Sequence, residues 1–195
     1  MDMVVNNSEA DAVPRIYIAL VHYPVLNKRG DIIASAVTNL DLHDIARAAK
    51  TYGVAEFFVV TPLADQKRLA ERIVAHWTTG GGPGYNEKRA EAFALITVSE
   101  TLAEAVARIE TQRGRPPALV VTTARQHEGA VGCDELLRLD RDVLLVFGTG
   151  WGIAPSLTET ADYILKPIAG VTGYNHLSVR SAVSILLDRM IWNDI

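Results

Sequence analysis

Three glycines at alternate positions follow the most apolar run of the chain. Gly148, Gly150 and Gly152 come directly after the run at 144–147, and Pro155 then suits the first turn of a helix. Glycine lets a backbone approach a ligand closely, and its amide group binds polar atoms without interference from a side chain. The segment therefore predicts a ligand-binding loop at the end of a buried strand. A tight turn that merely tolerates glycine is the alternative.

A second candidate segment lies near the C-terminus. An apolar run at 163–168 is followed by a glycine-containing loop, by Asn175 and His176, and then by an amphipathic pattern. Asn175 or Ser178 can cap the helix that this pattern predicts, a structural role that is compatible with ligand binding. A single histidine such as His176 is more often a surface side chain than a catalytic group.

A cluster of charged and titratable side chains occurs earlier in the chain. Asp41, His43 and Asp44 lie at the expected start of a helix, and Arg47 follows one turn later. A carboxylate or an imidazole there could remove a proton as a general base. The guanidinium of Arg47 could bind a phosphate or stabilise developing negative charge. In the alternative, structural interpretation, Asn39 or Asp41 caps the helix and Asp44 complements its dipole.

The elements that position these residues alternate between apolar runs and amphipathic patterns. The predicted strands cover 15–23, 56–61, 93–98, 118–123, 142–148 and 163–168, and the predicted helices cover 41–52, 65–77, 101–112 and 175–192. Strands that are apolar on both faces and separated by helices indicate an α/β fold, with a mostly parallel sheet covered by helices on both faces. Ligands bind at the carboxyl ends of such strands, so the glycines should share one edge with Thr122 and Thr123.

Three further segments carry structural predictions. The last helix has one apolar face, formed by Val179, Ala182, Val183, Leu186 and Met190. The glycine-rich stretch at 78–86 predicts a flexible loop. Residues 1–13 have neither a basic region nor a long apolar run, so we expect a disordered N-terminal tail before a single domain at 14–195.

The composition suits one α/β domain. The chain has 195 residues, 49% hydrophobic and 22% charged, which is enough to bury a core without metals or disulfides. With Cys133 as its one cysteine and no run near about 20 apolar residues, we expect a cytoplasmic location and no membrane span. The sequence contains no CxxC pair, which would predict a metal site, and no GxSxG segment, which would predict a hydrolase. The net charge of −4 counts against nucleic-acid affinity, although cations can still gather on one face.

The two glycine-containing C-terminal segments, in this order, resemble motifs two and three of the SPOUT, or α/β-knot, RNA methyltransferases. The segment at 39–62 is similar to the N-terminal motif of the ribose-methylating members, and Arg47 falls on the arginine of that motif. The resemblance covers residues 15–192. It comes closest to a subgroup that occurs alone or fused behind bacterial tRNA guanine methyltransferases.

The chain departs from the family pattern in two places. Asp41 stands where the N-terminal motif has asparagine, and His43 and Asp44 replace its small pair of residues. The usual acidic residue of motif two is absent, and Thr149 and Gly150 stand there instead. These departures concern the chemistry of the acceptor and leave the cofactor motifs intact.

The resemblance implies a homodimer that methylates tRNA or rRNA with S-adenosylmethionine (SAM), with a C-terminal trefoil knot and an active site between subunits. The predicted catalytic residues are Arg47, Asp41, His43 and Asp44. The cofactor would be held by the loops at 148–152 and 166–178, and its predicted ligands are Thr122, Thr123, Phe147, Gly148, Thr149, Gly150, Trp151, Gly152, Ile168, Tyr174, Asn175, His176, Leu177 and Ser178. An RNA-contacting surface could include Lys88, Arg89, Arg125 and Arg180, although a solvated face is the alternative for each.

Two other functions remain open from the sequence. The domain could bind SAM as an accessory module of a tRNA-modifying enzyme, such as a tRNA guanine methyltransferase, without catalysis of its own. It could also be an ordinary doubly wound nucleotide-binding protein. An early GxGxxG segment would favour the latter, and the first predicted strand is not followed by one.

Overall fold

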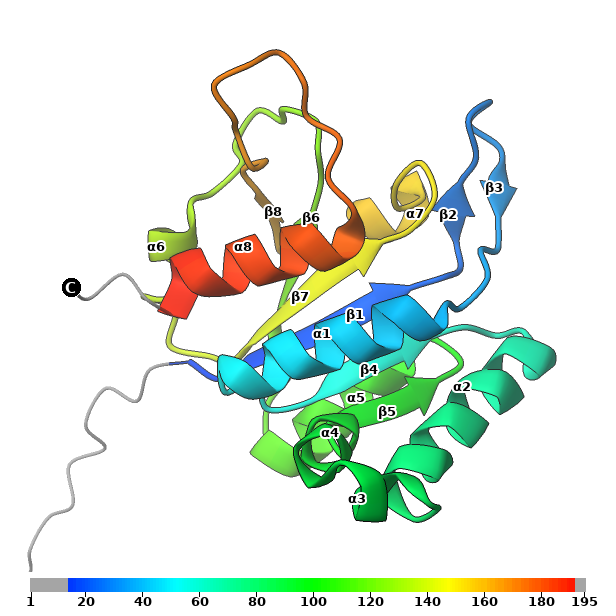
Figure 1. The fold of residues 1–195 in the computed structure, drawn as a ribbon. Helices are drawn as coiled ribbons and strands as arrows, with labels where there is room; N and C mark the ends of the chain where they lie inside the picture. Colours follow the sequence, from blue (N-terminus) through cyan, green and yellow to red (C-terminus); the bar gives the residue numbers. More distant parts are fainter. Residues whose placement is uncertain (1–13, 192–195) are drawn as a thin grey trace, which may run out of the picture.

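A six-stranded parallel sheet forms the centre of the molecule (Figure 1). The structure is a computed structural model that describes residues 14–191, so the tail predicted at 1–13 lies outside the described residues. The sheet order is β5-β4-β1-β7-β6-β8, with the strands Ile96–Ser99 (β5), Phe57–Val60 (β4), Ile16–Val21 (β1), Val143–Gly148 (β7), Ala118–Thr122 (β6) and Tyr163–Leu165 (β8). All neighbouring strands are parallel, which confirms the predicted α/β sheet.

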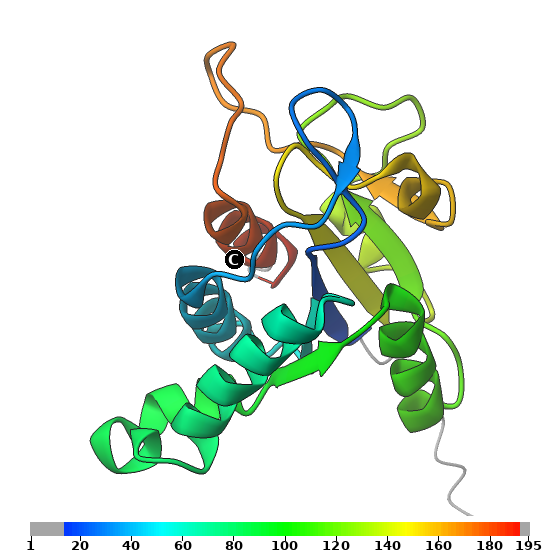
Figure 2. The same cartoon turned by 90° about the vertical axis from the view of Figure 1, so that its right-hand side faces the viewer.

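Helices cover both faces of the sheet, as Figure 2 shows. One face packs against α1 (Asn39–Thr51), α2 (Ala64–Thr78), α4 (Glu87–Phe93), α6 (Cys133–Leu136) and α8 (Val179–Ile191), and the short α3 (Gly82–Tyr85) joins α2 to α4. The other face packs against α5 (Leu102–Arg113) and α7 (Pro155–Thr158). A small antiparallel pair, β2 (Val25–Leu26) and β3 (Ile32–Ile33), extends beyond the sheet. Among residues 14–191, no helix has the length and apolarity needed to cross a membrane.

Side chains of the central strands alternate between the two layers. In β1, Ile16, Ile18 and Leu20 contact the core under α1 and α8, whereas Tyr17 and Ala19 contact the core under α5. Successive side chains of a strand point to opposite faces, so a strand buried on both faces must be apolar throughout. This explains why the apolar runs in the sequence predict these strands well.

The carboxyl ends of the central strands meet at one edge of the sheet. Val21, the last residue of β1, lies opposite Gly148 of β7 and Val60 of β4. Thr122 ends β6 at this edge, and its hydroxyl donates to the carbonyl of Val146 at 3.0 Å. The predicted placement of the glycines and Thr122 at a shared edge is confirmed.

Helix α1 begins next to this edge. Its cap is Thr38, whose Oγ1 accepts a hydrogen bond from the N–H of Asp41 at 3.1 Å. The prediction that Asn39 or Asp41 caps the helix is therefore wrong, because the threonine before Asn39 already occupies the capping position.

Helix α8 begins at Val179, later than the predicted start at 175. Ser178 supplies the cap, since its Oγ accepts a hydrogen bond from the N–H of Ser181 at 3.2 Å. The predicted apolar face is present, and it packs into the core of this chain: Val183, Leu186, Leu187 and Met190 are buried, and Val179 and Ala182 contact the same core. The face is thus an internal packing surface.

The stretch at 78–86 is more ordered than the predicted flexible loop. It contains α3, with Pro83 in the first turn. Gly82 is buried, and a Cβ at this position would lie 2.7 Å from the Cα of Trp77. The glycine therefore serves close packing of two chain segments.

Two long loops extend above the carboxyl edge (Figure 1). They follow β6 and β8, and the side-chain amide of Asn175 donates to the carbonyl of Ala124 between them at 3.1 Å. The second loop leads into α8. The trefoil knot that the family resemblance implies in this region stays a prediction.

Candidate functional site

A cavity of about 920 Å³ opens at the carboxyl edge of the sheet. Its volume lies within the range of clefts that hold cofactors and other small molecules. The walls come from segments far apart in the sequence: the stretch after β3, the loops after β6, β7 and β8, and the start of α8. This is the edge at which parallel α/β sheets bind ligands.

The cavity gathers almost all of the residues predicted to bind a cofactor. Its lining includes Thr122, Thr123, Phe147, Gly148, Thr149, Gly150, Trp151, Gly152, Ile168, Asn175, His176, Leu177 and Ser178. Tyr174 is the exception, because its side chain is exposed and stands edge-on to the ring of His176, outside the lining. The topology of the sheet brings the loops at 148–152 and 166–178 into one lining.

The glycine loop, residues 148–152, is held against β2 by backbone hydrogen bonds. The N–H of Trp151 donates to the carbonyl of Leu26 at 2.9 Å, and the N–H of Leu26 donates to the carbonyl of Gly152 at 2.9 Å. Gly150 has a φ of +61°, and a Cβ there would lie 2.9 Å from the carbonyl oxygen of Leu26. The turn itself therefore requires glycine at 150, and the same turn forms a wall of the cavity.

A series of side-chain hydrogen bonds connects the glycine loop to Ser35 and His22. Thr149 donates its hydroxyl to the carbonyl of Val21 at 3.1 Å, so it accepts the hydroxyl of Ser35. Ser35 in turn accepts from Nδ1 of the fully buried His22 at 3.0 Å. Burial lowers the pKa of His22 to about 4, so its ring is neutral near pH 7. A neutral ring that carries its proton on Nδ1 can donate to Ser35, and the Ser35 hydroxyl is then available to donate to Thr149.

One wall of the cavity, from β2 and the stretch after β3, could not be predicted from the sequence. Leu26, Ser35, Ala36 and Thr38 line the cavity from this side. Leu26 lies in the β2–β3 hairpin, which pairs with the distant glycine loop, and the other three follow this hairpin; no motif or periodic pattern marks any of them. The long-range pairing with the glycine loop becomes visible only in the folded chain.

Charged side chains of both signs face the cavity. Asp41 and Glu159 supply carboxylates, and Arg125 and Lys166 supply cations. Such a lining suits a ligand that carries both signs of charge. Within residues 14–191, no group of three or more His, Cys, Asp or Glu side chains is arranged to hold a metal ion.

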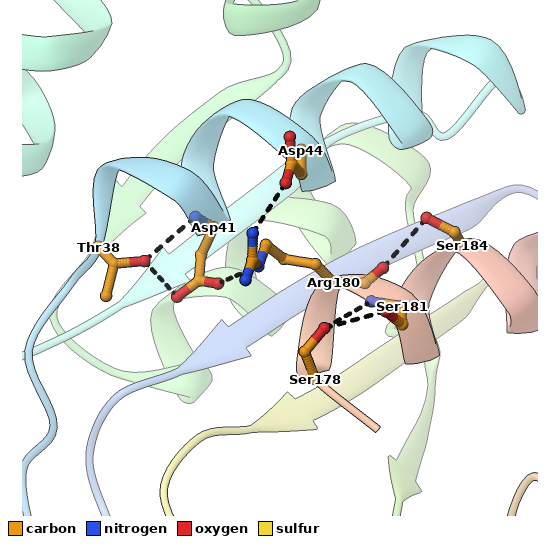
Figure 3. A network of polar contacts seen from close by, with 7 residues as sticks. All are labelled: Thr38, Asp41, Asp44, Ser178, Arg180, Ser181 and Ser184. Atoms are coloured by element: carbon orange, nitrogen blue, oxygen red, sulfur yellow. Dashed lines mark hydrogen bonds and ion pairs between the residues drawn. The ribbon is translucent and has the colours of Figure 1, made fainter. Parts of the chain in front are cut away.

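An arginine on α8 connects this helix to α1 at the margin of the cavity (Figure 3). Nε of Arg180 lies 3.3 Å from Oδ1 of Asp41, and its Nη1 lies 3.0 Å from Oδ2 of Asp44. The second oxygen of Asp41 accepts the hydroxyl of Thr38 at 2.6 Å. Both carboxylates of α1 are therefore engaged in holding α1 against α8.

The four residues predicted to be catalytic are divided between two sides of α1. Asp41 lines the cavity, whereas His43, Asp44 and Arg47 do not. His43 packs edge-on to the ring of Phe93, with 4.6 Å between ring centroids, on the side of α4. Arg47 is exposed one turn later on the same side of the helix.

Comparison with known proteins connects this site to a family. Residues 15–192 match the model of a family described as SAM-dependent RNA methyltransferase. A tRNA (guanine-N(1)-)-methyltransferase of Oleidesulfovibrio alaskensis is 43% identical over 178 residues, which are 90% of this chain and 42% of that protein. An uncharacterized protein of Aquifex aeolicus is 44% identical over 179 residues, which are 90% of this chain and 87% of that protein. The chain thus spans less than half the length of the first relative.

A solved structure shares the fold. The SpoU methyltransferase AviRb from Streptomyces viridochromogenes, in complex with the cofactor AdoMet, matches with a TM-score of 0.59 and 16% identity. The match covers 93% of this chain and 58% of that one. At this level of identity the likeness concerns the arrangement of strands and helices.

Proposed function

The chain belongs to the SAM-dependent RNA methyltransferase family, and we propose that it binds SAM in the cavity at the carboxyl edge and transfers the methyl group to tRNA or rRNA. The observation that carries the proposal is the position of the predicted cofactor residues. Two loops that lie far apart in the sequence, and whose glycines and polar side chains predict cofactor binding, line a single cavity of suitable volume.

The lining suits the chemical parts of SAM. Backbone groups of the glycine loop can bind the polar edges of the adenosine, and Phe147, Ile168 and Leu177 offer apolar contact to its base. Asp41 and Glu159 can attract the positive sulfonium and amino groups, and Arg125 and Lys166 can attract the carboxylate. Methyl transfer is an in-line displacement, so the main contribution of the protein is to hold donor and acceptor in line.

We assign the contact with RNA to Arg47 in preference to the other predicted catalytic residues. Asp41 and Asp44 are both engaged by Arg180, so each carboxylate already has a partner within the chain. His43 is packed between aromatic rings. The guanidinium of Arg47 is exposed, and in the family resemblance it falls on a motif residue.

A homodimer is part of the same proposal. The apolar face of α8 is used internally, so it offers no subunit contact. Exposed apolar side chains occur instead at the start of α1 and in the loop before α8: Leu40, Val171, Tyr174 and Leu177. We propose that a second copy covers this surface, and that the enzyme works in the cytoplasm.

A second candidate function is favoured by the longer relative. This chain corresponds to 42% of a protein named as a tRNA (guanine-N(1)-)-methyltransferase. The domain could accordingly act as a SAM-binding accessory module, and associate with a tRNA guanine methyltransferase, without transferring a methyl group itself.

Mass spectrometry of RNA nucleosides tests the proposal against this alternative. In a strain that lacks the gene, one methylated nucleoside of tRNA or rRNA should disappear, and the wild-type gene should restore it. Purified chain with SAM should also restore it in RNA from that strain. An unchanged set of methylated nucleosides would contradict the proposed activity.

A further inference from the structure

Away from the cavity, α1 and α4 carry two arginines that lack a carboxylate partner within residues 14–191. Arg47 on α1 and Arg89 on α4 take part in no ion pair there. Of the carboxylates on these two helices, Asp44 pairs with Arg180 at 3.0 Å and Glu91 pairs with Lys50 at 3.6 Å. Glu87, in the first turn of α4, takes part in no ion pair within residues 14–191, and neither does the neighbouring Lys88. This surface therefore carries local positive charge on a chain whose net charge is −4.

An aromatic ring holds one of these cations in place. Cζ of Arg89 lies 4.8 Å from the ring centroid of Trp77, a cation–π contact. His43 stands edge-on to Trp77 at 5.4 Å between centroids and to Phe93 at 4.6 Å. The three rings thus pack against one another, and the guanidinium of Arg89 lies over one of them.

The two arginines lie close to the same imidazole. Burial lowers the pKa of His43, and the positive charges of Arg89 and Arg47 lower it further. Two cations that both act on one neutral ring also repel each other, and an anion bound near them reduces this repulsion. The arrangement is one that an anion would stabilise.

We infer that Arg47, Arg89, His43 and Trp77 form a binding site for the phosphate backbone of the RNA substrate. The inference rests on the proposed function and assigns part of its substrate surface. Guanidinium groups bind phosphate oxygens in bidentate pairs, and aromatic rings beside them can stack on unpaired bases of RNA. Phosphate contacts of this kind position a nucleic acid without reading its sequence.

The site lies within reach of the cavity along one helix. Asp41 lines the cavity, and Arg47 lies on the same helix, about 9 Å further along the axis at 1.5 Å per residue. Because Arg47 faces α4, an RNA strand whose target nucleotide enters the cavity at the start of α1 would cross over α1 to reach the phosphate site.

Substitution of Arg89 tests this site without touching the cavity. We compare Arg89→Ala, Arg89→Lys and the control Arg138→Ala, which removes an exposed surface arginine near α6. Binding of the full, SAM-loaded chain to unfractionated bacterial tRNA is measured at several salt concentrations, SAM affinity by calorimetry, and oligomeric mass by light scattering.

Arg89→Ala should weaken tRNA binding by about tenfold and reduce the slope of log K against log salt by about 1, since one phosphate contact is lost. Arg89→Lys should recover part of the affinity, because it keeps the charge and loses the bidentate geometry. SAM affinity should be unchanged in all three variants, and Arg138→Ala should bind tRNA as the wild type does.

Wild-type tRNA affinity and salt slope in Arg89→Ala would overturn the phosphate site and leave the proposed methyl transfer standing. A loss of tRNA binding that accompanies a change from dimer to monomer would also overturn it, because the surface would then serve a subunit contact. A wild-type chain that binds SAM but neither tRNA nor rRNA would overturn both the site and the proposed function.

Discussion

Gly150 holds a backbone conformation that other residues adopt only with strain. Its φ is +61°, and a Cβ would approach the carbonyl oxygen of Leu26 to 2.9 Å. We expect Gly150→Val to displace the glycine loop and to weaken SAM binding by about tenfold, or about 1.4 kcal/mol. Calorimetry of the folded variant measures this change directly.

The matched control is Gly81→Val, at a glycine where a Cβ meets nothing within 4 Å. It should bind SAM with wild-type affinity. Equal affinity in the two variants would remove the glycine loop from the cofactor site.

The buried His22 makes stability depend on pH. Its pKa is about 4 in the folded chain because of burial, below the ordinary value near 6.5 of the unfolded chain. The unfolded chain therefore takes up a proton first as pH falls, so this stability is fully present above pH 6.5 and is lost toward pH 4, by about 3 kcal/mol at the limit. Thermal unfolding between pH 7.5 and 4.5, as test conditions, should show this loss.

A substitution isolates the contribution of this residue. His22→Asn can still donate to Ser35 and does not titrate, so its stability should fall less steeply over that range. His127→Asn, at an exposed histidine, should keep the wild-type profile. Identical slopes in His22→Asn and the wild type would show that another group causes the dependence.

Among individual residues of the site, the sequence predicted those that belong to motifs and missed those that support them. The alternating glycines and the pair Asn175 and Ser178 carry local signals, and all of them line the cavity. His22 and Ser35 carry none, because their roles depend on Thr149, far away in the chain.

Helices α1 and α8 depend on one arginine for their alignment at the cavity. Arg180 binds Asp41 and Asp44, and its removal leaves two carboxylates of α1 without their partner. Because these groups are partly exposed, we expect Arg180→Ala to cost about 1 kcal/mol of unfolding free energy. SAM affinity should also fall, since Asp41 and the start of α8 both line the cavity.

Denaturant unfolding and calorimetry measure the two effects. Arg189→Ala, at an exposed arginine of the same helix, is the control and should change neither. Unchanged stability and SAM affinity in Arg180→Ala would mean that packing alone aligns the helices.

Strands were easier to predict than helix ends. A strand buried on both faces must be apolar, and β1 and β7 therefore show plainly in the sequence. The end of a helix depends on which of several polar residues caps it. Thr38 and Asn39 are adjacent and both of a type that caps helices, so the sequence does not distinguish between them.

For the whole molecule, the proposed dimer rests on exposed apolar side chains near α1. Leu40 is 61% exposed at the start of the helix. We expect Leu40→Glu to convert a dimer into a monomer without unfolding, because it places a charge in the contact. Light scattering at micromolar concentration measures the mass.

Leu69→Glu is the control, since Leu69 is an exposed leucine on α2. It should leave the dimer intact. A wild-type chain that is monomeric while binding SAM would contradict the proposed assembly.

The family could be predicted at this scale because its two C-terminal motifs are local. Their joint position in one cavity could not, because it depends on the strand order that places β7 beside β6 and β1. The same holds for the phosphate site, whose residues lie on α1, α2 and α4.

Methyl transfer by the purified chain is the most direct test of the proposed function. The chain is incubated with isotopically labelled SAM and RNA from a strain that lacks the gene, and the nucleosides are analysed by mass spectrometry. We expect one labelled methylnucleoside with the wild-type chain and at least a tenfold lower initial rate with Gly150→Val at a SAM concentration well below Kd. A wild-type chain that binds SAM in this cavity yet labels no nucleoside in tRNA or rRNA would contradict the proposed function.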